Sequence, residues 1–230
     1  TSSIRDMLFA YGISSDRLLV SPDGVDLKIF DIAISKIDAR AKLGLPREGK
    51  FLLYSGSLQT MLMEKGIDVI FLALSTLPFD VRLLVVGGTA DDIAPYAACV
   101  RSLGVEDRVT FIPRVPRATL ALYQKVADVL LMPFPFTTHY AYYMSPLKLF
   151  EYMASCRPIV ATDLPSMRSV LDDTSALFIP PSDAMALARG IKRLLSDNEF
   201  SERIAGEAYR RVQQYSWDKR ARNIIQFINE

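Results

Sequence analysis

The chain has 230 residues, half of them hydrophobic and 23% charged, and its 27 Lys and Arg residues offset 26 Asp and Glu residues to leave a net charge of +1. This composition excludes disorder and argues against broad electrostatic binding of nucleic acid. Cys99 and Cys156 are too few for a disulfide framework, which favours a reducing, cytoplasmic compartment. The chain opens at Thr1 without an initiator Met or a signal pattern, so we expect a piece of a longer protein.

Short apolar runs alternate with segments of helical period along the chain. The predicted strands cover residues 18–21, 51–55, 82–86, 109–112, 129–132, 159–161 and 177–179. The predicted helices cover residues 34–43, 65–76, 93–103, 117–126, 146–154 and 166–171, then 184–195, 199–215 and 217–228 without further strands. Strands that are apolar on both faces predict a Rossmann-like, doubly wound parallel α/β sheet with C-terminal helices. Ligands of such sheets bind beyond the carboxyl ends of the strands.

Two glycine-containing loops follow predicted strands. After residues 51–55 comes Gly56, then a loop that ends in Lys65-Gly66 at a helix start. A lysine beside a helix N-terminus suits a pyrophosphate, although the P-loop spacing is absent and the motif taken alone favours an exposed lysine at the start of a helix. Gly87-Gly88 ends the next strand, where the backbone approaches either a ligand or the following helix.

A third loop leads into the helix predicted at residues 146–154. Ser145 can cap this helix and Pro146 suits its first position, so the N–H groups of Leu147 and Lys148 would point at an anion in the crevice. Glu151 follows one and a half turns later on an otherwise apolar helix. Its carboxylate can accept two hydroxyl hydrogen bonds from a ribose, or it can face solvent or a partner in the core.

His139 is the single histidine of the chain, so neither a histidine metal cluster nor a Ser-His-Asp arrangement can form away from it. A catalytic and a structural role both fit this residue. Aromatic residues surround it in the sequence, and they form either a lid or interdomain surface or the packing of a long loop: Phe134, Phe136, Tyr140, Tyr142 and Tyr143.

Four segments, in this order and spacing, resemble the C-terminal domain of family 4 glycosyltransferases: PDGVD at 22–26, GSL…EKG at 56–66, VVGG at 85–88 and SPLKLFEYMASCRPIVATDLP at 145–165. The resemblance covers the chain from about residue 16 onward. It implies the GT-B fold, in which two Rossmann-like domains face each other across a cleft, and this chain is similar to the half that binds the sugar nucleotide. The implied organisation is a linker or helix over residues 1–16, the nucleotide-sugar-binding domain over 17–215 and a crossover helix over 216–230.

The resemblance implies retaining transfer of a sugar from a UDP- or GDP-sugar donor, with no metal and no cofactor. The acceptor, a sugar, a lipid or another molecule, would bind an N-terminal domain absent from this chain, so the fragment alone would be inactive. Peripheral membrane association of the full-length protein stays open. Lys65 would contact the donor diphosphate and Glu151 the ribose, with the base beside residues 113–115. The implied donor-binding residues are Gly56, Ser57, Lys65, Gly87, Arg114, Val115, Tyr143, Ser145, Pro146, Leu147, Lys148 and Glu151.

Two positions depart from the family pattern. Tyr143 stands where a glutamate is usual, eight positions before Glu151, and Ser57 stands where an arginine is usual. Lys65 therefore lacks its partner cation unless Arg114 or Lys148 replaces it. These departures keep open a noncatalytic nucleotide-sugar-binding module with a decayed site. A nonhydrolysing sugar-nucleotide epimerase is disfavoured, because the chain has no second histidine and no acidic general-base cluster.

Overall fold

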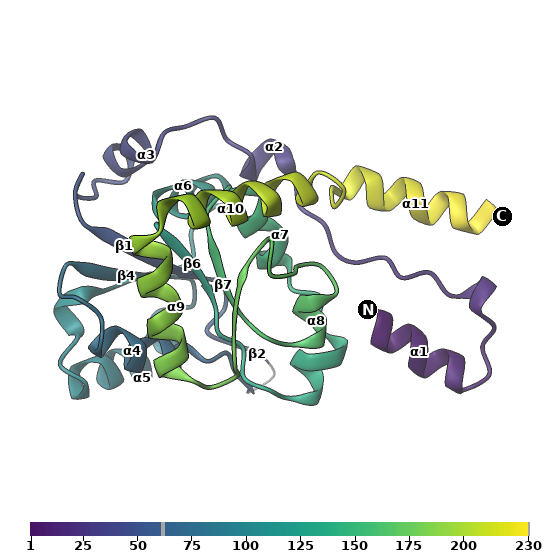
Figure 1. The fold of residues 1–230 in the computed structure, drawn as a ribbon, viewed down its shortest axis with the longest axis horizontal. Helices are drawn as coiled ribbons and strands as arrows, with labels where there is room; N and C mark the ends of the chain where they lie inside the picture. Colours follow the sequence, from purple (N-terminus) through teal and green to yellow (C-terminus); the bar gives the residue numbers. More distant parts are fainter. Residues whose placement is uncertain (61–62, 230) are drawn as a thin grey trace.

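The computed structural model describes all residues except 61–62 and 230. Six strands form one parallel sheet in the order β5-β4-β1-β6-β7-β8 (Figure 1). Their bounds are β1 Lys50–Ser55, β4 Val81–Val86, β5 Val109–Ile112, β6 Val129–Met132, β7 Ile159–Thr162 and β8 Leu177–Ile179. The predicted doubly wound α/β sheet is confirmed.

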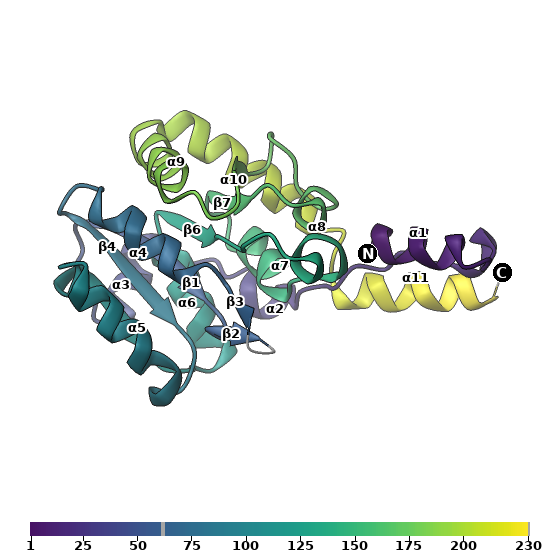
Figure 2. The ribbon, with the colours of Figure 1, turned by 90° about the horizontal axis from the view of Figure 1, so that it is seen from below.

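Helices cover both faces of the sheet (Figure 2). Side chains alternate along each strand, so Leu52 joins one hydrophobic cluster and Leu53 the other. One cluster includes α4 (Ile67–Ser75), α5 (Ala90–Ser102) and α9 (Ala184–Ser196). The other includes α2 (Leu27–Phe30), α3 (Lys36–Lys42), α6 (Arg117–Val126), α7 (Leu147–Ala154), α8 (Pro165–Arg168) and α10 (Asn198–Val212). Because both faces are buried, the central strands are mostly apolar.

The predicted strand at residues 18–21 is wrong. This segment is an extended linker that leads from α1 (Ser2–Ala10) and η1 (Ser15–Arg17) to the sheet domain, and it joins no strand of the sheet (Figure 1). An apolar, β-branched run favours extended backbone, but a strand also needs a partner with free hydrogen-bonding groups. The backbone of this region instead meets the chain near its other end, where Val25 N–H donates to the Tyr215 carbonyl at 2.8 Å.

Several short elements lie where loops were expected. Inside the loop after β1, β2 (Gln59–Thr60) and β3 (Met63–Glu64) pair antiparallel. The short 3₁₀-helix η2 (Glu106–Arg108) precedes β5, and η3 (His139–Tyr143) forms one π-helical turn before α7. The helix predicted at 93–103 begins earlier, at Ala90, because Thr89 and Asp92 form a reciprocal capping box.

The strand order reverses at β1. From β1 the chain winds outward through β4 to β5, and it then returns to place β6 on the other side of β1. This reversal is the topological switch point, where doubly wound sheets leave a crevice beyond the carboxyl ends of the strands. Backbone hydrogen bonds continue past the strand ends, with Gly56 N–H donating to Val86 at 2.9 Å and Gly87 N–H to Ile112 at 2.8 Å. The loops around the crevice therefore start from a rigid base.

Two helices project from the same side of the α/β domain, and both chain termini lie there (Figures 1 and 2). They are α1 and α11 (Trp217–Asn229), and neither has a buried residue. Across the described part of the chain, every helix is too short or too polar to cross a membrane.

Candidate functional site

A cleft of 1120 Å³ lies at the carboxyl ends of β1, β4, β5 and β6. It is lined by every predicted site residue except Tyr143, namely Gly56, Ser57, Lys65, Gly87, Arg114, Val115, Ser145, Pro146, Leu147, Lys148 and Glu151. These residues come from four loops and from the first turns of α7. The structure thus brings the three loops chosen from the sequence to one place.

Lys65 is buried at one end of the cleft. The residue is 8% exposed, and its ammonium donates to Ser57 Oγ at 2.7 Å. Burial lowers the pKa of Lys65 below its ordinary value. The interpretation of Lys65 as an exposed helix-start lysine is therefore wrong.

Two glycines shape the floor beneath this lysine. Gly66 has φ +75° at the start of α4, and a Cβ there would lie 1.9 Å from the Pro133 carbonyl oxygen. Gly87 has φ +134°, and a Cβ there would lie 2.2 Å from the carbonyl oxygen of Gly56. Both positions combine left-handed backbone with close contact to another backbone, so only glycine fits. At Gly87 the close neighbour is the backbone of Gly56 in the loop after β1 and not the following helix, and Gly87 also lines the cleft.

Lys148 comes from the first turn of α7, and its ammonium is buried. This ammonium lies 3.9 Å from the centre of the Tyr54 ring and 5.1 Å from that of Phe134, and it has no hydrogen-bond partner among the described residues. A Cβ on Gly56 would lie 3.4 Å from it. Desolvation and the charge of Lys65 lower the pKa of Lys148 well below its ordinary value. The two lysines therefore flank the segment Gly56-Ser57.

Glu151 lies further along α7, with its side chain 12% exposed. Desolvation raises the pKa of its carboxyl group, and the nearby Arg117 guanidinium, 3.9 Å from Oε1, opposes this rise. The solvent-facing alternative for Glu151 is wrong, because the carboxylate is largely buried and lines the cleft. Arg117 is itself 53% exposed, so the pair leaves the carboxylate with unused acceptor capacity.

Ser145 does not cap α7. The helix begins at Leu147 after Pro146 and no side-chain oxygen caps it, whereas Ser145 Oγ accepts the Asp23 N–H at 3.0 Å. The capping prediction is wrong because Ser145 lies one residue too early and the linker takes its hydroxyl. The Leu149 N–H donates to the Pro146 carbonyl at 3.0 Å, whereas the N–H groups of Leu147 and Lys148 come before the first hydrogen bond of this turn.

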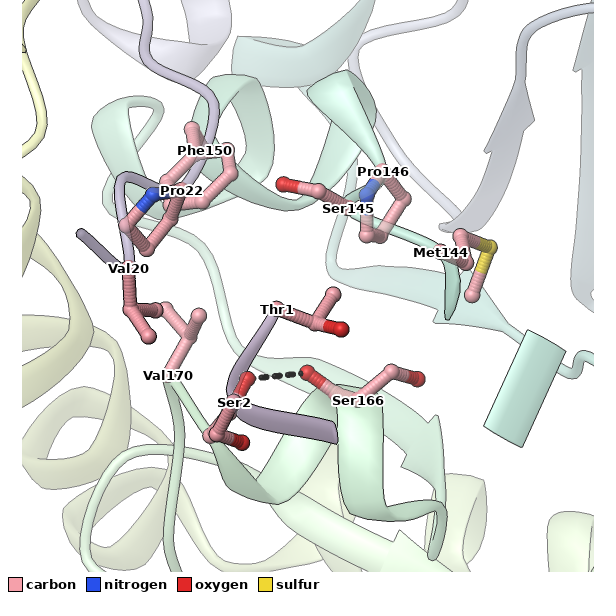
Figure 3. A pocket seen from close by; sticks show the side chains of 11 residues that line it. Thr1, Ser2, Val20, Pro22, Met144, Ser145, Pro146, Phe150, Ser166 and Val170 are labelled. Atoms are coloured by element: carbon pink, nitrogen blue, oxygen red, sulfur yellow. Dashed lines mark hydrogen bonds between the residues drawn. The ribbon is translucent and has the colours of Figure 1, made fainter. Parts of the chain in front are cut away.

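A smaller cavity of 210 Å³ lies behind this turn (Figure 3). Val20 and Pro22 of the linker line it together with Phe150 and Ser145 (Figure 3). The linker reaches the C-terminal segment through Asp23, whose carboxylate accepts from Arg220 at 2.5 Å. The linker therefore contacts both the segment just before α7 and the beginning of α11.

The aromatic loop divides into a buried and an exposed part. Phe134 and Tyr140 are buried, with ring centres 4.9 Å apart, whereas Phe136, Tyr142 and Tyr143 are exposed. Tyr143, at the end of η3, does not line the cleft, so the structure does not bring it together with the other predicted site residues.

Several cleft-lining residues were missed or were not assigned to the site from the sequence: Asp23, Gly88, Thr89, Asp92, Arg117, Leu120, Met144 and Trp217, together with His139. The pattern Thr-x-x-Asp after Gly87-Gly88 is a readable capping signal for Thr89 and Asp92. Trp217 had no local signal, because it reaches the cleft only through contacts between distant parts of the chain. The described residues contain no group of three or more His, Cys, Asp or Glu side chains suited to a metal ion.

Residues 35–211 match the family described as Glycosyl transferases group 1. The D-inositol 3-phosphate glycosyltransferase of Xylanimonas cellulosilytica is 33% identical over an alignment of 226 residues, which covers 94% of this chain and 52% of that protein. A relative of the same description from Kineococcus radiotolerans is 30% identical over 93% of this chain and 52% of that protein. The chain thus spans about half the length of the curated relatives it matches.

Solved structures share the fold. Sucrose-phosphate synthase from Thermosynechococcus elongatus has a TM-score of 0.79 at 28% identity, over 98% of this chain and 56% of that one. HepE from Anabaena, solved in complex with UDP and glucose, has a TM-score of 0.79 at 19% identity, over 98% of this chain and 60% of that one. The chain therefore belongs to the glycosyl transferases group 1 family, and it corresponds to the C-terminal domain of the two-domain GT-B enzymes.

Proposed function

We propose that the cleft binds a nucleoside-diphosphate-sugar donor, and that this chain is the donor-binding half of a retaining glycosyltransferase. The observation that carries the proposal is the burial of the Lys65 and Lys148 ammonium groups on either side of Gly56-Ser57. None of the described carboxylates lies within 4.0 Å of either ammonium. Buried cations ordinarily have anionic partners, so an anion brought by the ligand accounts for both.

The remaining polar groups fit the rest of the donor. The first N–H groups of α7 would bind the same phosphates, because a helix N-terminus carries partial positive charge. Glu151, buried and with unused acceptor capacity, would accept hydrogen bonds from the ribose hydroxyls. Arg114 and Val115 line the cleft where the base is expected.

The same groups would serve the chemistry. In glycosyl transfer the bond between the anomeric carbon and the diphosphate oxygen breaks, and negative charge grows on the departing nucleoside diphosphate. Cations and a helix N-terminus held in place beforehand stabilise that charge without reorganising during the reaction. The acceptor and the groups around its hydroxyl would come from a second domain, so this chain alone would bind donor and transfer nothing.

The test is titration calorimetry of the chain with UDP, GDP and ADP and with the matching nucleosides. We expect one diphosphate to bind selectively, and Glu151→Gln to weaken it about tenfold to a hundredfold, because a charged acceptor of two hydroxyls is lost. Glu202→Gln, an exposed carboxylate on α10, is the matched control and should change nothing. Unchanged affinity in a folded Glu151→Gln variant would remove Glu151 from the site, and no binding of any nucleotide would contradict the proposed function.

A noncatalytic nucleotide-sugar-binding module is the second candidate function. Tyr143 favours it, because this residue, where the resemblance expects a glutamate, lies outside the cleft. Release of nucleoside diphosphate from the donor by the full-length protein, in the presence of candidate acceptors, separates the two functions. Donor binding without any release would favour the module.

A further inference from the structure

Gln124, on α6, has a buried amide group without a hydrogen-bond partner. The residue is 0% exposed, and neither its amide nitrogen nor its amide oxygen has a hydrogen bond among the described residues. A buried amide without partners opposes folding, and an apolar side chain of the same length would occupy this position at lower cost. Packing alone therefore does not account for a glutamine here.

Gln124 acts on the same carboxylate as Arg117. The two residues are separated by two turns of α6, so they project from one side of the helix, and Leu120 between them on that side lines the cleft. The Arg117 guanidinium lies 3.9 Å from Glu151 Oε1. Burial raises the pKa of the Glu151 carboxyl group, and both Arg117 and the Gln124 amide, which acts as a hydrogen-bond donor, oppose this rise. Glu151 of α7 is therefore opposed from α6 by an exposed cation and by a buried amide.

The amide and the carboxylate are close together, but their hydrogen bond is not complete. Gln124 influences the ionisation of Glu151, yet neither of its polar atoms has a hydrogen bond of ordinary distance and angle. Hydrogen bonds of functional sites are often long or poorly aligned before a ligand binds, and they shorten in the complex. A small rotation of the Glu151 carboxylate would complete the bond without moving either helix.

We propose that Gln124 is a positioning residue for Glu151, whose carboxylate its amide N–H orients toward the ribose hydroxyls of the donor. The amide occupies one acceptor position of the carboxylate and leaves the others for the hydroxyls. Because an amide is neutral, it restricts the orientation of Glu151 without neutralising the charge that the hydroxyls require. This inference rests on the proposed function, in which Glu151 binds the ribose, and it gives a role to a residue that is not among those lining the cleft.

The experiment compares the wild-type chain with Gln124→Met, which keeps an unbranched side chain of similar length but removes both polar atoms. Titration calorimetry uses UDP, GDP or ADP, whichever binds the wild type, and the 2′,3′-dideoxy form of the same nucleotide, which lacks the hydroxyls in question. We expect Gln124→Met to weaken the ribonucleotide about threefold to thirtyfold and to leave the dideoxynucleotide within about twofold. Gln214→Met, at an exposed glutamine after α10, is the control and should change neither affinity.

The pH dependence gives a readout that a purely structural role would not change. The ratio of the two affinities isolates the ribose contact, because the phosphates titrate alike in both ligands. This ratio should fall as the pH is lowered and Glu151 takes up a proton. In Gln124→Met the fall should occur at higher pH, because loss of the donor raises the pKa of the carboxyl group further above its ordinary value. The other charged or titratable groups on α7 and around the cleft are the same in both proteins: Asp23, Lys65, Asp92, Arg114, Arg117, His139, Tyr140, Lys148 and Tyr152.

A double substitution separates an effect through Glu151 from an effect on the fold. If Gln124 acts through Glu151, adding Gln124→Met to Glu151→Gln should cost little further ribonucleotide affinity. Equal losses for the two ligands, or unchanged affinities and pH profile in folded Gln124→Met, would overturn the role of Gln124 while the proposed function stands. Failure of the wild-type chain to bind any of the three diphosphates would overturn the proposed function itself. Because Gln124→Met removes an unpartnered buried amide, the variant should remain folded, and its thermal unfolding is measured alongside.

Discussion

At the scale of single residues, the cleft contains charges that a stable empty protein would not bury. Lys65 and Lys148 carry two buried ammonium groups close together, and Glu151 is a buried carboxylate whose nearest cation is exposed. Burial of a charge without a close partner opposes folding. By contrast, Asp128 is buried with full compensation, since its carboxylate accepts from Arg40 at 3.0 Å and from the Phe51 N–H at 2.7 Å. Asp128 has its compensating partners within the chain, whereas Lys148 has no hydrogen bond there and Glu151 has only an exposed cation nearby.

This contrast predicts a pH-dependent stability for Lys148→Met in the absence of ligand. The pKa of Lys148 is lowered in the folded chain, whereas in the unfolded chain it is about 10.4. Below the folded pKa the lysine is charged in both states and its burial costs most. Between the folded and the unfolded pKa, the unfolded chain binds more protons than the folded chain does. The free energy of unfolding of the wild type therefore increases as pH rises through this range.

We therefore expect Lys148→Met to unfold at a higher temperature than the wild type at neutral pH, with a difference that shrinks as pH approaches about 10. Thermal unfolding across this range measures the difference, with Lys192→Met, at an exposed lysine on α9, as the control. A gap that stays constant or widens with pH would contradict the burial of a titrating Lys148.

At the scale of elements, patterns predicted the sheet better than they predicted the loops. Short apolar runs in the sequence predict the positions of the six strands, and this prediction does not require the order of the strands in the sheet. Residues 18–21 show the limit of this reasoning, because the run is extended in the structure but pairs with no strand. The first residue of a helix depended on individual polar groups. Helix α5 begins at Ala90 because Thr89 caps it, whereas Ser145 does not cap α7 because its hydroxyl accepts the Asp23 N–H of the linker.

Two glycines, Gly206 inside a helix and Gly66 in a loop, should respond in opposite ways to substitution by alanine. Gly206 lies inside α10, where an added Cβ would meet no atom within 4 Å, so Gly206→Ala should stabilise the chain by about 0.5–1 kcal/mol. Gly66→Ala should destabilise it by about 2 kcal/mol or more, because its Cβ would meet the Pro133 carbonyl in a left-handed conformation. Denaturant unfolding measures both, and similar effects of the two substitutions would contradict this geometry.

At the scale of the whole molecule, the α/β domain is complete without the projecting helices. The outer half of α11 has exposed Ile225 and Ile228 and no buried residue, whereas the segment just before α11 is packed. Tyr215 lies with its ring centre 5.1 Å from that of Phe150, and its carbonyl accepts the Val25 N–H. The apolar side chains of α1 and α11 fit the expectation of a second domain, which stays a prediction.

Truncation after Arg222 should therefore change the unfolding temperature of the chain by less than about 2 °C. Tyr215→Ala should lower it clearly, because this ring packs against Phe150 of α7 and the hydrophobic cluster around it. Differential scanning calorimetry of the two variants checks this division. A large loss on truncation would mean that the outer part of α11 packs on the domain after all.

The sequence by itself determined the α/β class, the strands of the sheet and the family resemblance, and all but one of the site residues predicted from it line the cleft. These follow from local patterns and from the order of motifs along the chain. Only the tertiary structure decided that the Lys65 and Lys148 ammonium groups are buried beside one another, that the linker binds Ser145, and that Tyr143 lies outside the cleft. The physical reason is that burial and hydrogen bonding depend on which distant segments meet, and no local pattern contains that information.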